Sequence, residues 1–406
     1  MPMPMKEIVA ERLRSVKFSP SMAAKARVNA LRAAGVTIVD FTLGEPDFPT
    51  PAHIVEAAGD AMRAGQTRYT ESSGTLALRS AIAHKLTVEN GLDYGADEIV
   101  VGCGAKHIIF NAFAASLNPG DEVIVPAPFW VSYPDMVAIN GGVPVLVPTT
   151  AISGLKLTAS ALESALSPRT RWLVLNTPNN PSGAVYSEAE LRAITAVLLR
   201  HPQVWLMTDE IYEHFVYGTA RHISPVHIEP ALRDRALVVN GLSKAYAMTG
   251  WRIGYGAGPK ALVKAIDLLL SQSTTCANSV SQAAAVAALE GPQSCVADAV
   301  AAYSRRGERM AALLNEIPGF KCTQPSGAFY IFASVEGLIG KTDPSGVKLD
   351  SSLALMTFLL DHAGVACIEG ASYGSSSSLR FSFATSIDQI ERGCASIREA
   401  CALLDA

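Results

Sequence analysis

Helical and strand patterns alternate along most of this chain. Apolar residues recur at i, i+3 and i+4, which predicts amphipathic helices, at 52–64, 75–89, 106–117, 131–140, 187–200, 260–290, 293–315, 350–363 and 387–403. Short β-branched and apolar runs, which predict buried strands, lie at 98–101, 122–125, 143–147, 172–175, 204–207 and 237–239. Such alternation is typical of an α/β fold, with a mostly parallel sheet covered by helices on both faces.

The order of elements changes after about residue 290, where a helix is followed by strands and then by another helix. A chain of 406 residues is too long for one simple core, and 49% hydrophobic residues can supply two. We therefore predict a large domain over 46–292 and a smaller α+β domain made of 1–45 and 293–406. Periodicity alone does not join the first residues to the last; that expectation comes from the family resemblance below.

Composition narrows the classes of partner. The chain has 33 Lys and Arg against 37 Asp and Glu, a formal net charge of -4, and no basic stripe, which favours a small-molecule partner over nucleic acid or an anionic membrane. No apolar run approaches the ~20 residues of a membrane span, and the first residues lack the apolar core of a signal peptide. Its 7 cysteines are scattered without a C-x-x-C pair, which predicts reduced thiols in the cytoplasm rather than disulfides or a zinc site.

Lys244 is placed where a buried strand is predicted to end, in the stretch A-L-V-V-N-G-L-S-K-A at 236–245. Beside an apolar strand its ammonium would be partly desolvated, which lowers the pKa and makes the amine a nucleophile towards a carbonyl, as a Schiff base requires. An isolated S-K pair is more often a solvated loop lysine. Ligands of open α/β sheets bind beyond the carboxyl ends of the strands, so the residues after each strand are the other candidates.

Four further segments follow predicted strands. G-C-G-A-K-H at 102–107 offers glycine backbone and a helix N-terminus to a phosphate. P-A-P-F-W-V-S-Y at 126–133 contains an indole, N-T-P-N-N-P-S-G at 176–183 is dense in turn formers, and T-D-E-I-Y at 208–212 puts a carboxylate at the end of an apolar strand. Each also has a structural interpretation: a short turn, a core indole, a plain loop, and a helix cap for Asp209.

The stretch S-K-A-Y-A-M-T-G-W-R-I-G-Y at 243–255 resembles the cofactor-lysine segment of the fold type I pyridoxal-phosphate aminotransferases, especially the bacterial aspartate aminotransferase subgroup. Matching motifs follow in the same order over nearly the whole chain. The resemblance implies a large domain with a mostly parallel seven-stranded sheet flanked by helices, and a smaller α+β domain built from both chain ends. It also implies that Lys244 holds pyridoxal 5′-phosphate as a Schiff base and that Arg252 grips its phosphate.

The resemblance assigns further cofactor contacts by position. They are Gly104, Ala105, Lys106 and Ser243 near the phosphate, Trp130 and Asp209 at the ring, and Asn180 and Tyr212 at the phenolic oxygen. A carboxylate beside the ring nitrogen keeps the ring protonated and makes it an electron sink. Tyr69, in T-R-Y-T, matches a tyrosine that reaches the phosphate of the neighbouring subunit, which implies a homodimer with shared active sites.

Two details of the sequence bear on the register of these motifs. The resemblance suggests cis peptide bonds at Asn180–Pro181 and Ala127–Pro128, a geometry that is costly outside proline. Gly241 stands where some relatives carry a serine donor to the phosphate. Phosphate binding would then depend more on Ser243, Arg252 and the helix that opens at Gly104.

The resemblance also assigns the substrate contacts. Arg380, in S-S-L-R-F-S-F, matches the arginine that binds the substrate α-carboxylate, and Gly44, in F-T-L-G-E-P-D-F, lets backbone approach it. Lys106, with Ser19 and Ser21, matches the group that receives a distal carboxylate in the aspartate subgroup. This favours aspartate with 2-oxoglutarate, and prephenate as a further acidic acceptor. The alternative is that Lys106 only neutralises the cofactor phosphate. Trp130 and Asn180 are also expected to contact substrate.

The predicted reaction is a ping-pong transamination between an amino acid and a 2-oxo acid, in which Lys244 is both covalent anchor and general acid/base, assisted by Asp209 and Tyr212. The same kind of site supports aminotransferases for aromatic or aliphatic amino acids and C–S lyases, because the protein's electrostatics choose which bond breaks. A cofactor-sensing regulator is the non-enzymatic alternative. It is disfavoured because the roughly 45 residues before the large domain are too few for a DNA-binding module and contain no basic recognition helix.

Overall fold

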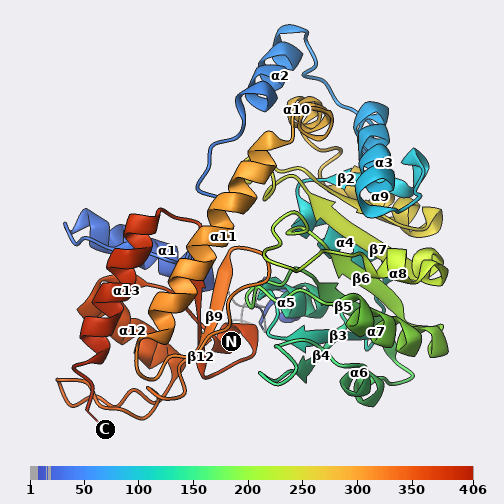
Figure 1. Ribbon diagram of the computed structural model, residues 1–406. Helices are drawn as coiled ribbons and strands as arrows, with labels where there is room; N and C mark the ends of the chain where they lie inside the picture. Colours follow the sequence, from blue (N-terminus) through green and yellow to red (C-terminus); the bar gives the residue numbers. More distant parts are fainter. Residues whose placement is uncertain (1–7, 15, 17–19, 406) are drawn as a thin grey trace, which may run out of the picture.

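The computed structural model describes residues 8–14, 16 and 20–405, with the side chains of 20–26 excepted. A large sheet with its helices forms one side of the molecule, and a group of C-terminal helices and short strands forms the other (Figure 1). The long helix α11 (Ser294–Asn315) runs along both parts. No helix of this described part is long and apolar enough to cross a bilayer, and all of the cysteines are free thiols.

The large sheet has seven strands in the order β2-β8-β7-β6-β5-β3-β4. Their bounds are β2 (Ile99–Gly102), β3 (Glu122–Ala127), β4 (Val143–Pro148), β5 (Thr170–Asn176), β6 (Trp205–Asp209), β7 (Ala236–Gly241) and β8 (Gly254–Ala257). β8 is antiparallel to both of its neighbours, and every other neighbouring pair is parallel. The predicted mostly parallel sheet is therefore confirmed.

The hydrophobic pattern did not predict β8, because glycine is a poor strand former. Gly254 and Gly256 occupy two of its four positions. A Cβ at Gly254 would collide with the backbone of Ala105, and a Cβ at Gly256 would lie 2.8 Å from the Ile108 side chain. The glycines therefore let the first turns of helix α4 (Ala105–Ser116) pack directly on the sheet.

Helices cover both faces of this sheet. They are α2 (Ala52–Arg63), α3 (Leu76–Asn90), α4, α5 (Ser132–Ile139), α6 (Ala159–Ala165), α7 (Glu188–Arg200), α8 (Pro225–Ile228), α9 (Lys260–Ser273) and α10 (Ser279–Glu290). Alternate residues of β5 enter different cores: Leu173 and Leu175 pack in one hydrophobic cluster, and Trp172 and Val174 in another. Burial of both strand faces explains why the strands read as continuous apolar runs.

The single helix predicted over 260–290 is wrong. α9 ends at Ser273 and α10 begins at Ser279. Thr275 has a φ of 65°, in the left-handed region that interrupts a helix, and the Asn278 side chain caps α10 by accepting a hydrogen bond from the Ser281 backbone at 2.9 Å. The pattern also missed α6, whose 7 residues are too few to establish a helical period.

The C-terminal part forms a smaller α+β unit. Its elements after α11 are β9 (Tyr330–Ser334), α12 (Ser352–Ala363), β10 (Val365–Ala366), β11 (Ile368–Glu369), β12 (Ser378–Ser382) and α13 (Ile387–Cys401). β11, β12 and β9 form an antiparallel sheet, while β10 pairs in parallel with β1 (Val39–Asp40) from the start of the chain.

Residues near position 40 pack with this C-terminal unit. The rings of Phe41 and Phe381 are 6.2 Å apart and belong to the same hydrophobic cluster. Helix α1 (Pro20–Ala33) precedes this segment and also lies on the C-terminal side of the molecule (Figure 1). On this basis we propose the division into a domain over 46–292 and a second domain made of 1–45 and 293–406.

Candidate active site

A cavity of about 380 Å³ lies where strands of the large sheet end, within the usual size of a small-molecule site. β5 ends at Asn176, β6 ends at Asp209, and Lys244 follows the end of β7. The predicted site residues that line it are Gly44, Ala105, Lys106, Trp130, Asn180, Asp209, Tyr212, Ser243, Lys244, Arg252 and Arg380. Sequence positions up to 336 residues apart thus meet in one cavity.

The remaining predicted residues are placed differently. Gly104 lies beside the cavity as the N-cap of α4. Tyr69 does not line the cavity, and its side chain is 86% exposed. Ser19 lies outside the described residues, and at Ser21 only the backbone, in the first turn of α1, is described.

Lys244 is positioned by the loop that carries Gly44. Its Nζ donates a hydrogen bond to the Gly44 carbonyl oxygen and lies 5.9 Å from the ring centroids of both Tyr212 and Phe329. Burial lowers the pKa of Lys244 to about 8, although the negative charge of Glu45 opposes that shift. A lysine with this pKa is far more often neutral near pH 7 than a surface lysine, and the neutral amine is the nucleophile.

Asp209 is a buried carboxylate held by two hydrogen bonds. Oδ2 accepts from the Tyr133 hydroxyl at 2.6 Å, and Oδ1 accepts from the Ile211 backbone N–H at 3.2 Å. Burial raises the pKa of Asp209 to about 6, and both hydrogen bonds oppose that rise. A cationic group bound beside Asp209 would return it to the ionised form and would itself be held protonated.

Tyr133 was not predicted as a site residue, although it ends the segment 126–133. It lies three residues after Trp130, and the two rings form an edge-to-face pair with centroids 5.2 Å apart. Its place in the first turn of α5, directly after the strand-end segment that carries Trp130, was the available signal.

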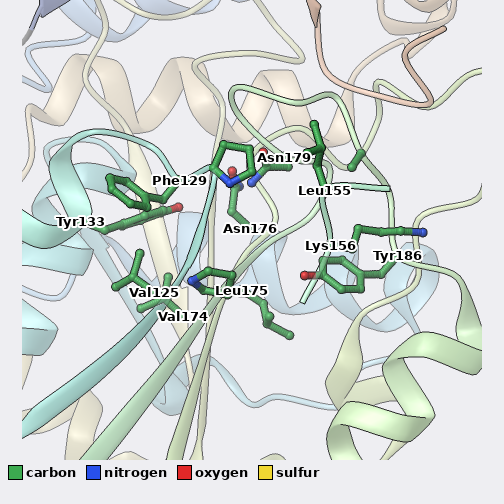
Figure 2. A pocket seen from close by; sticks show the side chains of 13 residues that line it. Val125, Phe129, Tyr133, Leu155, Lys156, Val174, Leu175, Asn176, Asn179 and Tyr186 are labelled. Atoms are coloured by element: carbon green, nitrogen blue, oxygen red, sulfur yellow. The ribbon is translucent and has the colours of Figure 1, made fainter. Parts of the chain in front are cut away.

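A second, smaller cavity of about 20 Å³ is lined by Tyr133 and Asn176, two residues that donate hydrogen bonds to Asp209, and Figure 2 shows both of them with Asn179 among the side chains around it. It has room for about one water molecule among polar groups. Asn176 Nδ2 also donates to the Asp209 backbone carbonyl at 2.9 Å. Asp209 is therefore fixed through both its side chain and its backbone.

Buried ion pairs hold the segment 209–213 in place. Glu210 is fully buried and contacts His222 Nε2 at 3.0 Å, while Glu213 forms an ion pair with the buried Lys85. Both carboxylates accept further hydrogen bonds from neighbouring side chains. Paired and hydrogen-bonded charges tolerate burial, so this network holds the segment 209–213 rigidly in place.

The part of the cavity formed by Arg252 and the N-terminus of α4 is suited to binding an anion. Arg252 has a φ of 58°, and its guanidinium donates to the backbone carbonyls of Thr249, at 2.8 Å, and Cys103, at 3.3 Å. A Cβ at Gly104 would lie 2.5 Å from Arg252 Nη2, so glycine is needed to keep this space. A guanidinium beside the N-terminus of α4 is a combination that binds phosphate.

Gly241 also has a steric reason to be glycine. A Cβ at this position would lie 2.9 Å from the Gly254 Cα and 3.0 Å from the Ile253 carbonyl oxygen. A serine here would therefore require the antiparallel pair β7–β8 to move apart.

Arg380 is buried between two aromatic rings. Its guanidinium carbon lies 4.6 Å from the Tyr330 ring centroid and 5.3 Å from that of Tyr373. Nη2 donates to the Thr42 carbonyl oxygen at 2.8 Å and Nη1 to Asn180 Oδ1 at 3.2 Å, while Nε has no partner among the described residues. A buried guanidinium with a spare donor is suited to a carboxylate.

Other side chains of the cavity meet in pairs. The hydroxyls of Tyr212 and Tyr330 are 2.9 Å apart, and Lys106 Nζ lies 4.7 Å from the Trp130 ring centroid. Burial and the nearby Arg252 lower the pKa of Lys106. Tyr330 was missed by the sequence reasoning, because no motif marked it. The peptide bonds Ala127–Pro128 and Asn180–Pro181 are cis, as expected, and Thr177–Pro178 is cis as well.

This fold and site belong to a known enzyme class. Residues 36–397 match the family model of aminotransferase class I and II, and the chain belongs to that family. It is 48% identical to an aspartate aminotransferase of Rhizobium meliloti, over 97% of this chain and 96% of that protein. It is 46% identical to an aspartate/prephenate aminotransferase of Cereibacter sphaeroides, over 97% and 98% of the two chains.

Solved structures agree with this assignment. The crystal structure of the Rhizobium meliloti aspartate aminotransferase superimposes with a TM-score of 0.95 at 47% identity, covering 98% of this chain and 99% of that one. The Thermus thermophilus aspartate aminotransferase with maleate gives a TM-score of 0.90 at 39% identity, covering 97% and 99%. The predicted family and fold class are therefore confirmed.

Proposed function

We propose that this protein is a pyridoxal-phosphate-dependent aspartate aminotransferase that moves the amino group of aspartate to 2-oxoglutarate. The observation that carries the proposal is the meeting of Lys244, Asp209 and Arg380 in one cavity. They supply a lysine with a lowered pKa, a buried carboxylate and a buried guanidinium with a spare donor. The relatives named above support the same reaction.

The polar residues of the cavity fit the phosphate, the ring nitrogen and the phenolic oxygen of the cofactor. Arg252, Ser243 and the N-terminus of α4 at Gly104 would hold the phosphate, and glycine at position 104 leaves room for the Arg252 guanidinium, which a Cβ would displace. Trp130 would stack on the ring and Asp209 would pair with its nitrogen. At the phenolic oxygen, Tyr212 and Asn180 would be the donors; because Asn180 Oδ1 already accepts from Arg380, its Nδ2 group is the end that can donate.

When bound, pyridoxal phosphate supplies an aldehyde for the amino group and a cationic ring that withdraws electrons from the substrate Cα. Asp209 holds the ring nitrogen protonated, and its own ionisation is supported by Tyr133. With the cofactor bound, the neutral amine of Lys244 would be the base that takes the substrate α-proton and then, as an ammonium, the acid that gives it to the C4′ carbon of the cofactor. Arg380 fixes the α-carboxylate so that the α-proton faces Lys244.

The acidic substrate preference rests on a second cation. We propose that Lys106 receives the distal carboxylate, with Ser19 and Ser21 as further contacts, and that prephenate is a further acidic acceptor. Lys106 lines the cavity together with Trp130, and its Nζ lies 4.7 Å from the centroid of that ring. Burial and the nearby Arg252 lower the pKa of Lys106. A carboxylate bound beside it would raise this pKa again and favour the charged ammonium.

We also propose a homodimer whose active sites are shared, working in the cytoplasm. Tyr69 is a large aromatic residue that is 86% exposed in the single chain, so its ring is available to a partner subunit. In the dimer, Tyr69 of one chain would reach the phosphate site of the other. Free thiols on all 7 cysteines favour a reducing compartment.

Replacement of the central lysine tests the reaction. Lys244→Ala should still bind pyridoxal phosphate weakly through the remaining contacts and lose transamination of aspartate by at least about 10⁴-fold. Lys260→Ala, which removes a surface lysine paired with Asp97, is the control and should keep full activity. Turnover near that of the unmodified enzyme in Lys244→Ala would refute the proposal.

A further inference from the structure

The loop over 41–50 crosses from the C-terminal unit to the large sheet and contributes backbone to the active site. The Thr42 carbonyl accepts from Arg380 Nη2, and the Gly44 carbonyl accepts from Lys244 Nζ. At the far end of the loop, the Thr50 hydroxyl donates to the Ala247 carbonyl at 2.7 Å. The loop is therefore in direct contact with the carboxylate-binding arginine and with the lysine of the cofactor-free chain.

Between these two ends the loop is attached to helix α11 by a group of three side chains, Asp47, Tyr303 and Arg306, which we call the clasp. Arg306 Nη1 contacts both carboxylate oxygens of Asp47, at 2.8 and 3.0 Å. The Tyr303 hydroxyl donates to Asp47 Oδ1 at 3.1 Å, and the Asp47 backbone N–H donates to the same hydroxyl at 3.3 Å. Asp47 thus has both its side chain and its backbone fixed to α11.

The clasp is better ordered than an ordinary surface ion pair. The guanidinium of Arg306 lies 5.1 Å from the Phe48 ring centroid and 5.4 Å from that of Tyr303, and it packs against the edge-to-face pair that these two rings form. The side chains of Arg306 and Asp47 are only 14% and 26% exposed, and Tyr303 is fully buried. Partial burial and fixed partners make such a pair worth more than an exposed one.

We infer that the clasp is a positioning device for substrate binding: by holding the 41–50 loop on α11, it keeps Gly44 and Arg380 in place to receive the substrate carboxylate. This inference rests on the proposed function and adds residues that touch no substrate themselves. Because the clasp acts on a contact made equally in the ground state and the transition state, its loss should raise KM more than it lowers kcat. It also joins the two proposed domains next to the site.

The test uses Arg306→Gln in the cofactor-loaded enzyme, with Arg309→Gln as a matched control. Arg309 lies one turn further along α11 and pairs with Glu391 at 2.8 Å, with both side chains about half exposed. We expect Arg306→Gln to raise KM for aspartate about tenfold and to change kcat less than about threefold, with no change in the control. Arg306→Lys should recover part of the loss. Asp47→Asn combined with Arg306→Gln should cost little more than either change alone.

Two further measurements separate positioning from simple stability. Hydrogen exchange of the amides in 42–49 should be faster in Arg306→Gln and unchanged in Arg309→Gln. The Kd of succinate, an unreactive dicarboxylate, should rise about tenfold by calorimetry. If the melting temperature falls while KM, the succinate Kd and exchange over 42–49 stay unchanged, the clasp is only structural and the inference is wrong. If the unmodified enzyme does not turn over aspartate, the proposed function fails, and succinate binding still decides the role of the clasp.

Discussion

The hydroxyl of Tyr133 donates a hydrogen bond of 2.6 Å to the carboxylate of Asp209. This bond stabilises the ionised carboxylate in a position where burial favours the neutral acid and raises the pKa to about 6. Tyr133 comes from helix α5 and Asp209 from the end of β6, so the packing of that helix on the sheet is coupled to the charge at the centre of the site.

Removing this hydroxyl should shift the activity towards higher pH. In Tyr133→Phe the carboxylate loses a stabilising donor, so the pKa of Asp209 rises and a larger fraction is neutral at pH 7. A hydrogen bond to a charged group contributes about 1.5–3 kcal/mol, which is about 1–2 pKa units. From a pKa of about 6, the ionised fraction of Asp209, and with it kcat/KM, should therefore fall about 2- to 15-fold at pH 7 and less at pH 9. The measurement is the pH profile of kcat/KM, whose acid limb should move upward.

The control for this prediction is Tyr186→Phe, which removes another buried phenol beside the small cavity. The Tyr186 oxygen accepts from the Leu157 backbone N–H at 2.8 Å and does not contact Asp209. Its loss should lower the melting temperature without moving the acid limb. An unchanged acid limb in Tyr133→Phe would show that Asp209 does not depend on this bond.

The choice of amino acid should depend on Lys106. In Lys106→Ser, kcat/KM for aspartate should fall about 10- to 100-fold, whereas that for an apolar amino acid such as leucine should change less than about threefold. The ratio of the two specificity constants is the measurement. Equal losses for both substrates, together with weaker cofactor binding, would mean that Lys106 serves the phosphate instead.

Stability should depend on pH through His222. Contact with Glu210 raises the pKa of His222 above its ordinary 6.5 in spite of burial, with Glu213 adding to the rise and Lys85 opposing it. A raised folded-state pKa stabilises the protein below the unfolded pKa, and this contribution is lost as the pH rises through the folded value. His222→Gln should therefore cost about 1 kcal/mol or more of unfolding free energy at pH 6 beyond its cost at pH 9.

A surface pair serves as the comparison for His222. His201 Nε2 also contacts a glutamate, Glu163, at 3.0 Å, but both side chains are partly exposed. Because solvent screens that pair, His201→Gln should cost less unfolding free energy than His222→Gln at pH 6 in denaturant unfolding. An equal cost of His222→Gln at pH 6 and pH 9 would show that the buried histidine is neutral.

Much of the large sheet followed from the sequence because both faces of its parallel strands are buried. Strands such as β5 and β6 read as uninterrupted apolar runs, and the helices between them show a clear period. The pattern did not predict β8 because two of its four residues are glycines, which have low strand propensity but allow the close approach of α4. The pattern did not predict the break between α9 and α10 because the start of α10 is set by a single capping asparagine within an otherwise helical sequence.

The site likewise contains residues that stand in recognisable sequence motifs and residues whose contacts form only in the folded chain. Lys244, Asp209 and Arg252 stand in dense motifs, Asp209 at the end of β6 and the other two between β7 and β8. The sequence therefore predicts them as site residues, and the structure places all three on one cavity. Tyr330 and Arg306 have no local signal: their importance arises from contacts with residues that lie more than 100 positions away in the chain. Only the packed structure brings such pairs together.

The central claim is that this site exchanges amino groups between aspartate and a 2-oxo acid. The most direct measurement is the absorbance spectrum of the purified, cofactor-loaded protein before and after aspartate is added, and again after 2-oxoglutarate. We predict that aspartate shifts the cofactor band and that 2-oxoglutarate restores it, because each reagent drives one half of the reaction. A cofactor band that aspartate leaves unchanged would contradict the claim.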